Sequence, residues 1–203
     1  MSRITAYCHL NEEYCSVNGA ILAERDKESH DSWFKQLYKE QEFAYPKFHK
    51  MDALSQAGFI ASELIKRANP KIVNGYADDE IALLFGNRFS SADTDSRFRT
   101  SYTENGAPSP ALFVYTLPNI VLGEIAILNK WYGENMFVVL PKFAPEFFVN
   151  YTEILISTGS KAVFCGWLDI TADRTNVFVF LVESEAEEGI DCNVPNLREY
   201  SGI

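Results

Sequence analysis

Apolar residues along the chain follow two kinds of pattern, short runs bounded by polar turns and stripes at helical spacing. Residues 4–10 and 14–22 are apolar runs on either side of the polar turn Asn11-Glu12-Glu13, and they predict two short strands. Residues 31–42 predict a helix. Asp52 can cap a second helix that ends at Asn69-Pro70, and the apolar positions of this helix recur every three or four residues (Leu54, Ala57, Ala61, Leu64 and Ile65).

The rest of the chain alternates strands with helices. Strands are expected at residues 80–85, 136–140, 161–168 and 176–183, the last two as a hairpin. A helix is expected to begin at residues 90–94, and a separate, proline-broken helical region is expected to end at about Lys130. A further helix is expected from Pro145 to Gly159. This alternation predicts a single α/β domain over residues 1–203, with a mixed five-stranded sheet and helices on its faces.

Composition narrows the class of protein. The 203 residues are 47% hydrophobic and 14% aromatic, which excludes a disordered chain and fits one domain with a sizeable core. The net charge of −10 argues against a nucleic-acid partner, which would need a basic face. The most acidic stretch is the tail, residues 183–203, which is either a docking surface for a basic partner or, more simply, a solvated tail.

Cysteine spacing and the apolar stretches predict a cytoplasmic protein. The four cysteines form no CxxC pair, and the N-terminus lacks the apolar core of a signal peptide. The longest apolar stretch, residues 111–128, contains Pro118, Asn119 and Glu124, which hydrocarbon would penalise. We therefore expect reduced thiols, and a buried element rather than a membrane span.

Residue patterns that carry common site chemistry are weak or missing. The three histidines, His9, His30 and His49, all lie in the first quarter of the chain. The run Asp93-Thr94-Asp95 has metal-like spacing, but Phe98 stands where a calcium loop needs glycine, so helix capping is the better interpretation. The glycines match no phosphate-binding motif. The sequence predicts neither a metal nor a cofactor.

One stretch is specific enough to suggest a family. Ser109, Pro110, Asn119, Gly123 and Gly133 stand, without a gap, in a register that resembles the region of β-ketoacyl synthases just before their reactive cysteine. The resemblance covers roughly residues 45–170. It is strongest to the short β-ketoacyl synthase-like N-terminal-domain group, found beside acyl-carrier-protein-dependent aryl-polyene or flexirubin-type pathways. It implies a thiolase-like fold, of which this chain corresponds to the first of two similar halves.

The resemblance also locates the family's nucleophile. The ungapped register places that position at Lys142, between Pro141 and Phe143, and an amine cannot form the thioester of the condensing reaction. The catalytic histidines of the second half are likewise outside this sequence. The resemblance thus implies an inactive ketosynthase-like partner in fatty acid, aryl-polyene or polyketide-type biosynthesis. The alternative is a diverged acyl-transfer enzyme or acyl-binding protein that uses Lys142, Cys165 or an imported residue.

The same resemblance suggests where partners or substrate would bind. The aromatic residues of the relevant segments line the dimer interface and acyl tunnel in the family, and the candidates here are Phe113, Tyr115, Asn119, Phe143 and Phe147. They either fill the core of this domain or remain exposed for a partner. We expect a homodimer or a heterodimer with a ketosynthase. An acyl carrier protein is a further candidate partner, for a basic patch formed by Lys47, Lys50, Lys66, Arg67 and Lys71.

Overall fold

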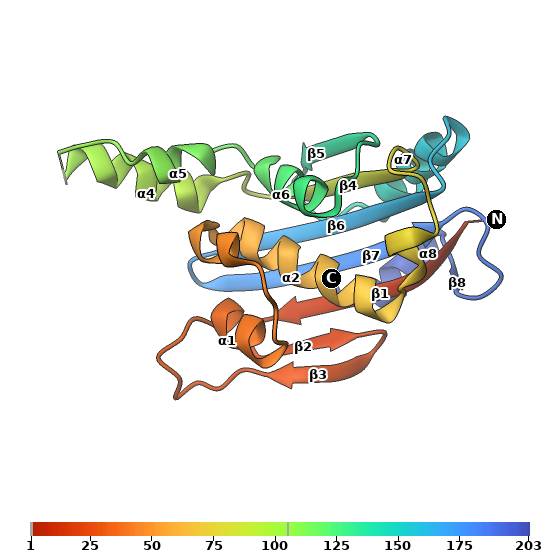
Figure 1. Ribbon diagram of the computed structural model, residues 1–203, viewed down its shortest axis with the longest axis horizontal. Coiled ribbons are helices and arrows are strands. Elements are labelled where there is room, and N and C mark those ends of the chain that lie inside the picture. The colour runs from red at the N-terminus through yellow and green to blue at the C-terminus, as the bar shows by residue number, and fades with distance from the viewer. Residues whose placement is uncertain (1, 105) are drawn as a thin grey trace.

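The computed structural model describes residues 2–104 and 106–203 and consists of one mixed sheet with helices on both faces (Figure 1). The sheet has eight strands in the order β3-β2-β1-β7-β6-β4-β5, with β8 also paired to β1. The strands are β1 (Arg3–Asn11), β2 (Tyr14–Val17), β3 (Ala20–Glu24), β4 (Ile81–Asn87), β5 (Asn135–Val139), β6 (Ala162–Thr171), β7 (Arg174–Glu183) and β8 (Ile190–Asp191).

The sheet is mixed, as predicted. Strand β4 runs parallel to β5 and β6, whereas the β6–β7, β7–β1, β1–β2 and β2–β3 pairs are antiparallel. The expected number of five strands was wrong. Residues 14–22 do not form one strand but turn back at Asn18-Gly19, where both residues have positive φ (51° and 82°). An Asn-Gly pair is the usual sequence of such a hairpin turn.

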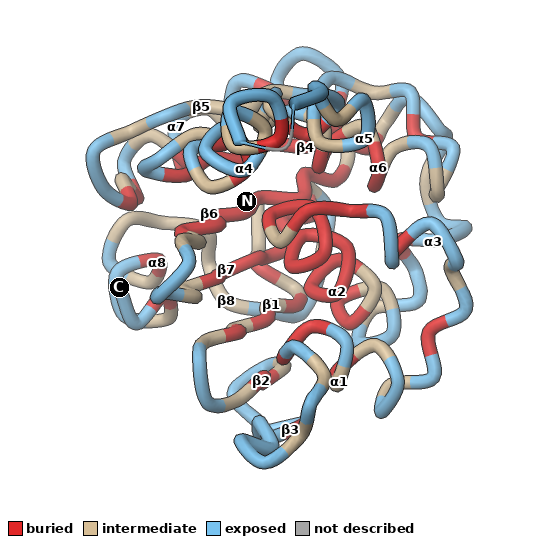
Figure 2. The backbone as a smooth tube through the Cα atoms, turned by 90° about the vertical axis from the view of Figure 1, so that its left-hand side faces the viewer, coloured by how far each residue is buried: buried red, intermediate tan, exposed pale blue. Residues whose placement is uncertain are grey.

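Helices cover the two faces unequally. The helices are α1 (Trp33–Glu40), α2 (Ala53–Ala68), α3 (Lys71–Asn74), α4 (Ala92–Thr103), α5 (Pro110–Val114), α6 (Ile120–Asn129), α7 (Pro145–Ser157) and α8 (Val194–Ser201), with a 3₁₀ turn, η1 (Pro46–Lys50). Buried side chains of α1, α2 and α6 pack on one face, and those of α7 and α8 pack on the other. Helix α2 lies in the middle of the first layer and is buried on most sides (Figure 2).

Strand β1 contributes to both faces. Ala6, Cys8 and Leu10 belong to the core under α2, whereas Ile4 belongs to the core under α7 and α8. The cause is a shift in the β1–β7 register between Ile4 and Ala6, which pair with the consecutive residues Val182 and Leu181. One extra residue on β1 makes this a β-bulge, and the bulge moves the following side chains to the opposite face.

Helices α4 and α5 project from the body as an arm (Figure 1). The base of the arm is buried, and Thr94 Oγ1 donates a hydrogen bond to Asp52 Oδ2 at 2.8 Å. Farther out, Tyr102, Phe113 and Val114 are exposed. The arm is therefore fixed at its base by polar contacts and leaves apolar side chains uncovered beyond them.

The acidic tail is folded rather than simply solvated. Residues 190–191 form β8, and Asn193 caps α8 by accepting a hydrogen bond from the Asn196 backbone N–H at 2.9 Å. Leu197 and Ser201 are buried. The sequence signal missed these elements because their apolar positions are few. Among the described residues, no helix combines the length and the apolar character needed to cross a membrane.

Candidate functional site

Lys142 lies in the short turn that connects β5 to α7. Strand β5 ends at Val139, and the Leu140 N–H donates to the carbonyl oxygen of Asn87 at 3.0 Å, which holds the turn against the end of β4. Helix α7 begins at Pro145, and Lys142 is exposed. The side chain at position 142 is thus presented at the carboxyl ends of parallel strands and before a helix N-terminus. A thiol in such a place would be activated, but an amine gains nothing from the helix dipole.

A cavity of about 430 Å³ adjoins this turn. It is lined by the turn and the first residues of α7, together with Arg198, Ser201 and Ile203 from the C-terminal segment. Arg198 forms an ion pair with Glu146. The pKa of Glu146 is lowered by its own backbone N–H, by Arg198 and by Lys142. The described residues that line this cavity include neither a cysteine nor a histidine.

Cys165 lies away from the Lys142 turn and is inaccessible. It is fully buried on β6, where its Sγ atom lies 3.3 Å from Thr152 Oγ1 in the middle of α7. Burial raises the pKa of the Cys165 thiol well above its usual range. A buried thiol with a raised pKa is a weak nucleophile. Cys165 therefore lies beneath α7 as a small apolar side chain rather than at the start of that helix.

Two of the predicted site residues flank the start of α7. Phe143 is buried against Phe148, Trp167 and Phe178, with ring centroids 5.2, 6.0 and 6.0 Å away. Phe147 is partly buried and stacks on Tyr151 at 5.6 Å. Phe143 anchors the Lys142 turn to β6 and β7, whereas Phe147 packs along its own helix. Of the two, only Phe147 has surface left for another molecule.

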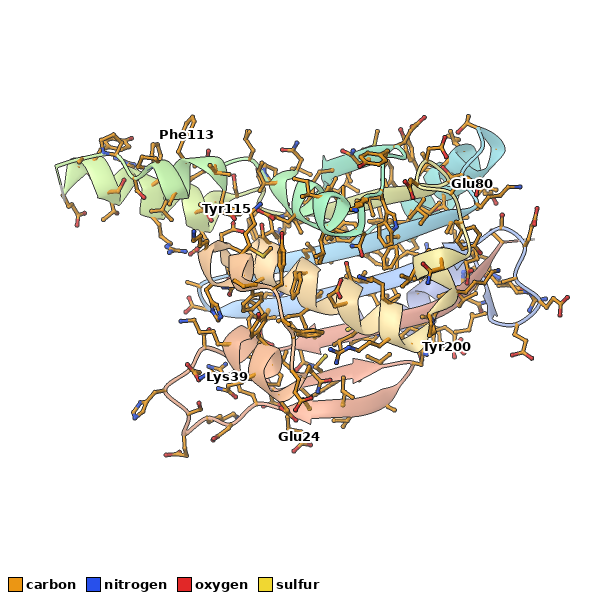
Figure 3. The ribbon with its side chains drawn as sticks, viewed as in Figure 1. Glu24, Lys39, Glu80, Phe113, Tyr115 and Tyr200 are labelled. Atoms are coloured by element: carbon orange, nitrogen blue, oxygen red, sulfur yellow. The ribbon has the colours of Figure 1, made fainter. Side chains whose placement is uncertain are left out.

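The other three candidates lie on the arm and at the start of α6, toward the opposite end of the long axis (Figure 1). Phe113 points outward from α5 and is 62% exposed, whereas Tyr115 is buried (Figure 3). Asn119 is exposed and precedes α6 without a side-chain cap bond. The five candidates thus form two separate groups and not one pocket.

A buried polar contact between α6 and its neighbours was not foreseen from the sequence. The Tyr115 hydroxyl donates to Glu124 Oε1 at 3.0 Å, and Lys47 Nζ lies 2.7 Å from Glu124 Oε2. Burial and the charge of Glu124 raise the pKa of Tyr115 well above its usual range. The contact explains how Glu124 stands within an apolar helix. A glutamate in such a stretch signals a buried partner but does not say which residue it is.

Most of the expected basic patch is engaged within the molecule. Lys47, Lys66 and Lys71 pair with Glu124, Glu63 and Glu183 respectively. The Arg67 guanidinium lies over the ring of Phe43, 4.4 Å from its centroid. The carboxylates offset the charges of the three lysines, whereas the phenyl ring leaves the charge of Arg67 in place. Three of the five cations therefore have an acidic partner, and Lys50 and Arg67 are exposed without an ion pair among the described residues.

Comparisons with known proteins identify the fold. No family model matches the sequence, and no curated protein matches it. The ishigamide ketosynthase/chain length factor superposes with a TM-score of 0.64 at 16% identity, over 92% of this chain and 63% of that one. A complex of a type II PKS acyl-carrier protein with its hexaketide-bound ketosynthase, AntDE:AntF, gives 0.62 at 10% identity, over 90% and 62%.

A third structure is similar along nearly its whole length. The complex of the ketosynthase ApeO with its chain length factor ApeC from Xenorhabdus doucetiae gives a TM-score of 0.63 at 13% identity, over 99% of this chain and 90% of the matched chain. The chain spans less than two thirds of the first two structures but most of the third. It therefore has the fold of ketosynthases and chain length factors, and the expected thiolase-like fold is confirmed.

Proposed function

We propose that this chain, which has the fold of ketosynthases and chain length factors, is a non-catalytic subunit that pairs with a ketosynthase. The pair would act in acyl-carrier-protein-dependent biosynthesis of the fatty-acid, aryl-polyene or polyketide type. The observation that carries the proposal is Lys142 at the turn between β5 and α7, where the fold would present a nucleophile. Loss of such a nucleophile typically costs about a million-fold in turnover.

The proposal treats residues 1–203 as one cytoplasmic domain. The sheet supports a single domain, because β1 near one end of the sequence pairs with β7 and β8 near the other. The cytoplasmic assignment is supported by the cysteines, since Cys8, Cys15, Cys165 and Cys192 are all free thiols.

An exposed apolar surface supports the pairing. We call it the α5–β5 surface, and its members are the exposed side chains Phe113, Val114, Leu117, Ile127, Tyr132 and Val139. Both views place α5, α6 and β5 along the same edge of the molecule (Figures 1 and 2). Exposed apolar patches on globular proteins commonly mark interaction sites. Phe113 from the predicted interface set belongs to this surface.

The α5–β5 surface ends on an unprotected strand. Strand β5 is the last strand of the sheet and pairs only with β4, so one row of its backbone N–H and C=O groups faces outward. Its sequence, Asn-Met-Phe-Val-Val, contains no charge and no proline. Natural proteins usually protect such an edge with one or the other, because a bare edge is a template for pairing. A subunit partner would cover it.

The first experiment tests the absence of catalysis. The purified chain is incubated with an acyl thioester or with a ketosynthase-directed covalent inhibitor, and its intact mass is measured. We expect the mass to stay unchanged and no elongation of a primed substrate. A stable adduct that disappears on Lys142→Ala or Cys165→Ala would overturn the proposal in favour of an acyl-transfer enzyme.

The second experiment tests the pairing. The chain is co-expressed with a ketosynthase encoded beside it, and the molar mass of the purified material is measured by light scattering. We expect a 1:1 complex, and we expect the complex to elongate substrate only while the ketosynthase keeps its cysteine. A chain that stays monomeric and never co-purifies with a ketosynthase contradicts the proposal.

A further inference from the structure

On the face of the sheet that carries α7 and α8, the helices leave part of the surface uncovered. Two cavities adjoin there, of about 220 and 490 Å³, between α8 and the strands β1, β2 and β3. They share His9, Tyr14, Glu199 and Tyr200 in their walls, so they form one continuous groove. The larger cavity falls within the range of about 300–1,000 Å³ typical of small-molecule sites.

Aromatic rings enclose this groove at steep angles to one another. The rings of Tyr7 and Tyr200 lie 5.6 Å apart at 61°, and those of Tyr7 and His9 lie 5.9 Å apart at 85°. His9 is held in place, because its Nε2 atom lies 2.7 Å from the carbonyl oxygen of Tyr200 and its ring stacks on Phe178. Tyr14 lines both cavities. Tyr7, Tyr14 and Tyr200 are each partly exposed and therefore have ring surface left to meet a ligand.

The charge in the groove is negative and comes from one side chain. Among the described residues that line the two cavities there is no lysine, arginine or aspartate, and Glu199 is the only acid. Glu199 forms no ion pair with any part of the chain that the structure describes. Burial lowers the pKa of His9, so its imidazole is neutral near pH 7. The groove therefore combines several aromatic rings with one uncompensated carboxylate.

We propose that this groove is a binding site for a small organic ammonium compound, with the cationic head among Tyr7, Tyr14 and Tyr200 and its charge balanced by Glu199. The faces of aromatic rings attract cations, and quaternary ammonium groups are the usual ligands of such aromatic enclosures. A weakly hydrated alkylammonium loses little on leaving water. An anion would be repelled by Glu199, and a neutral compound would lack the ionic attraction to it. The groove borders the cavity at the Lys142 turn through Ser201, which lines both, but none of the three tyrosines lines that cavity. The proposal does not depend on the proposed pairing.

The test uses two cationic probes and one neutral control. The chain is titrated with tetramethylammonium, with choline, and with 3,3-dimethylbutan-1-ol, which has the shape of choline without its charge. Binding is followed by calorimetry and by the amide NMR signals of Gly19 and Gly202, which border the groove. We expect saturable shifts with both cations and none with the alcohol. Equal shifts with the alcohol, or none with either cation, would overturn the proposal.

Variants locate the site. Tyr200→Ala should weaken binding of tetramethylammonium about three- to thirty-fold, the range expected for loss of a cation–π contact. Glu199→Gln should weaken it and remove most of its salt dependence, and this exposed position leaves the core intact. Tyr102→Ala is the matched control, because Tyr102 is an exposed tyrosine on α4 that does not line the groove. Unchanged affinity in Glu199→Gln, or equal losses in the control, would place binding elsewhere.

Discussion

Gly133 lies where two stretches of backbone touch. A Cβ atom at this position would stand 2.2 Å from the carbonyl oxygen of Ile81, and backbone cannot move aside as a side chain can. Gly133→Ala should therefore lower the free energy of unfolding by more than about 2 kcal/mol through strain in a well-packed region. Urea denaturation of the purified variant measures the loss.

Gly123 provides the control for this substitution. It stands inside α6, and a Cβ there would have no atom within 4 Å. Gly123→Ala should leave stability unchanged or raise it by about 0.5–1 kcal/mol, because alanine favours helix over glycine. If both variants lost the same stability, the close approach at Gly133 would not be the cause.

Glu183 is a buried carboxylate with four partners. Asn69 Nδ2 donates to its Oε2 at 2.6 Å, Tyr76 donates to its Oε1, and Lys71 Nζ lies 3.4 Å away. Burial alone would raise the pKa of Glu183, but hydrogen bonds from Thr5, Tyr76 and Asn69 and the charge of Lys71 together lower it below its ordinary 4.5. The ionised form therefore stabilises the folded state.

The sign of the pH dependence follows from that lowered pKa. The contribution of Glu183 is complete above pH 4.5 and is lost as the pH falls from there through the folded pKa. Glu183→Gln should cost about 1–3 kcal/mol at pH 7, because its amide meets donors where the carboxylate accepted. Unfolding free energies of both proteins between pH 7 and pH 3 should converge toward acid. A constant gap would refute this assignment.

Single residues in the sequence predicted caps and turns but not contacts between elements. Asp52 was predicted to cap a helix, and its Oδ1 accepts from the Ser55 N–H at 2.9 Å. Gly58 gave no signal, yet a Cβ there would stand 2.3 Å from Val121 Cγ2, so it sets how closely α2 and α6 approach. The Asp52 cap joins residues three positions apart in the chain, whereas the approach of Gly58 to Val121 joins segments more than sixty residues apart.

At the scale of elements, Asp52 joins the start of α2 to the arm. Its Oδ1 caps α2 and its Oδ2 accepts from Thr94 on α4. Asp52→Ala should cost about 1–2 kcal/mol through the lost cap alone. Asp52→Asn keeps an oxygen for the cap but replaces the charged acceptor beside Thr94 with a neutral amide, whose hydrogen bond is weaker, so it should loosen the arm with a smaller loss of global stability.

Hydrogen exchange separates the two effects. In Asp52→Asn the amides of α4 should exchange faster, while those of α2 stay protected. Thr94→Val is the matched variant, because it removes the donor of the same hydrogen bond, and it should also speed the exchange of the α4 amides. Unaltered exchange of α4 in both variants would show that the arm is held by other contacts.

The edge strand β5 gives the sharpest test of partner binding. Val139 ends β5 and is 53% exposed, and a lysine there would put a charge on the bare edge. Val139→Lys should weaken association with the ketosynthase at least about tenfold, because charge at the core of an interface is strongly disfavoured. Ile154→Lys on α7 is equally exposed, at 53%, and should bind normally. Light scattering across a concentration series compares them.

Elements with a helical stripe or a clearly bounded apolar run could be predicted, and a turn within an apolar run and a mostly polar helix could not. Helices α2 and α7 matched their stripes, and the proline-broken region did divide into α5 and α6. The β2–β3 hairpin and α8 were missed. The hairpin was missed because apolar residues lie on both sides of Asn18-Gly19 and were interpreted as one strand, and α8 was missed because few of its positions are apolar.

For the whole molecule, the order of the strands in the sheet could not be predicted from the sequence. Strand β1 lies beside β7, more than 160 residues away, and nothing local specifies such a neighbour. The site was predicted only in part. Lys142 lies between β5 and α7, and its role as the family's nucleophile position stays a prediction. Phe113 and Phe143 were grouped on family grounds and lie in separate regions.

Thr5 is the one residue that β1 has in excess over β7, since its neighbours Ile4 and Ala6 pair with adjacent positions. Deleting Thr5 would make Ile4 and Ala6 consecutive, and consecutive residues of a regular strand already point to opposite sides. Each would keep its own side of the sheet. Deleting Tyr7 instead would move the side chain of every preceding β1 residue to the opposite face of the sheet. Thr5 is therefore the one position where β1 could shorten without moving its other side chains to the opposite face, and that shortening would remove the hydrogen bond of Thr5 to Glu183.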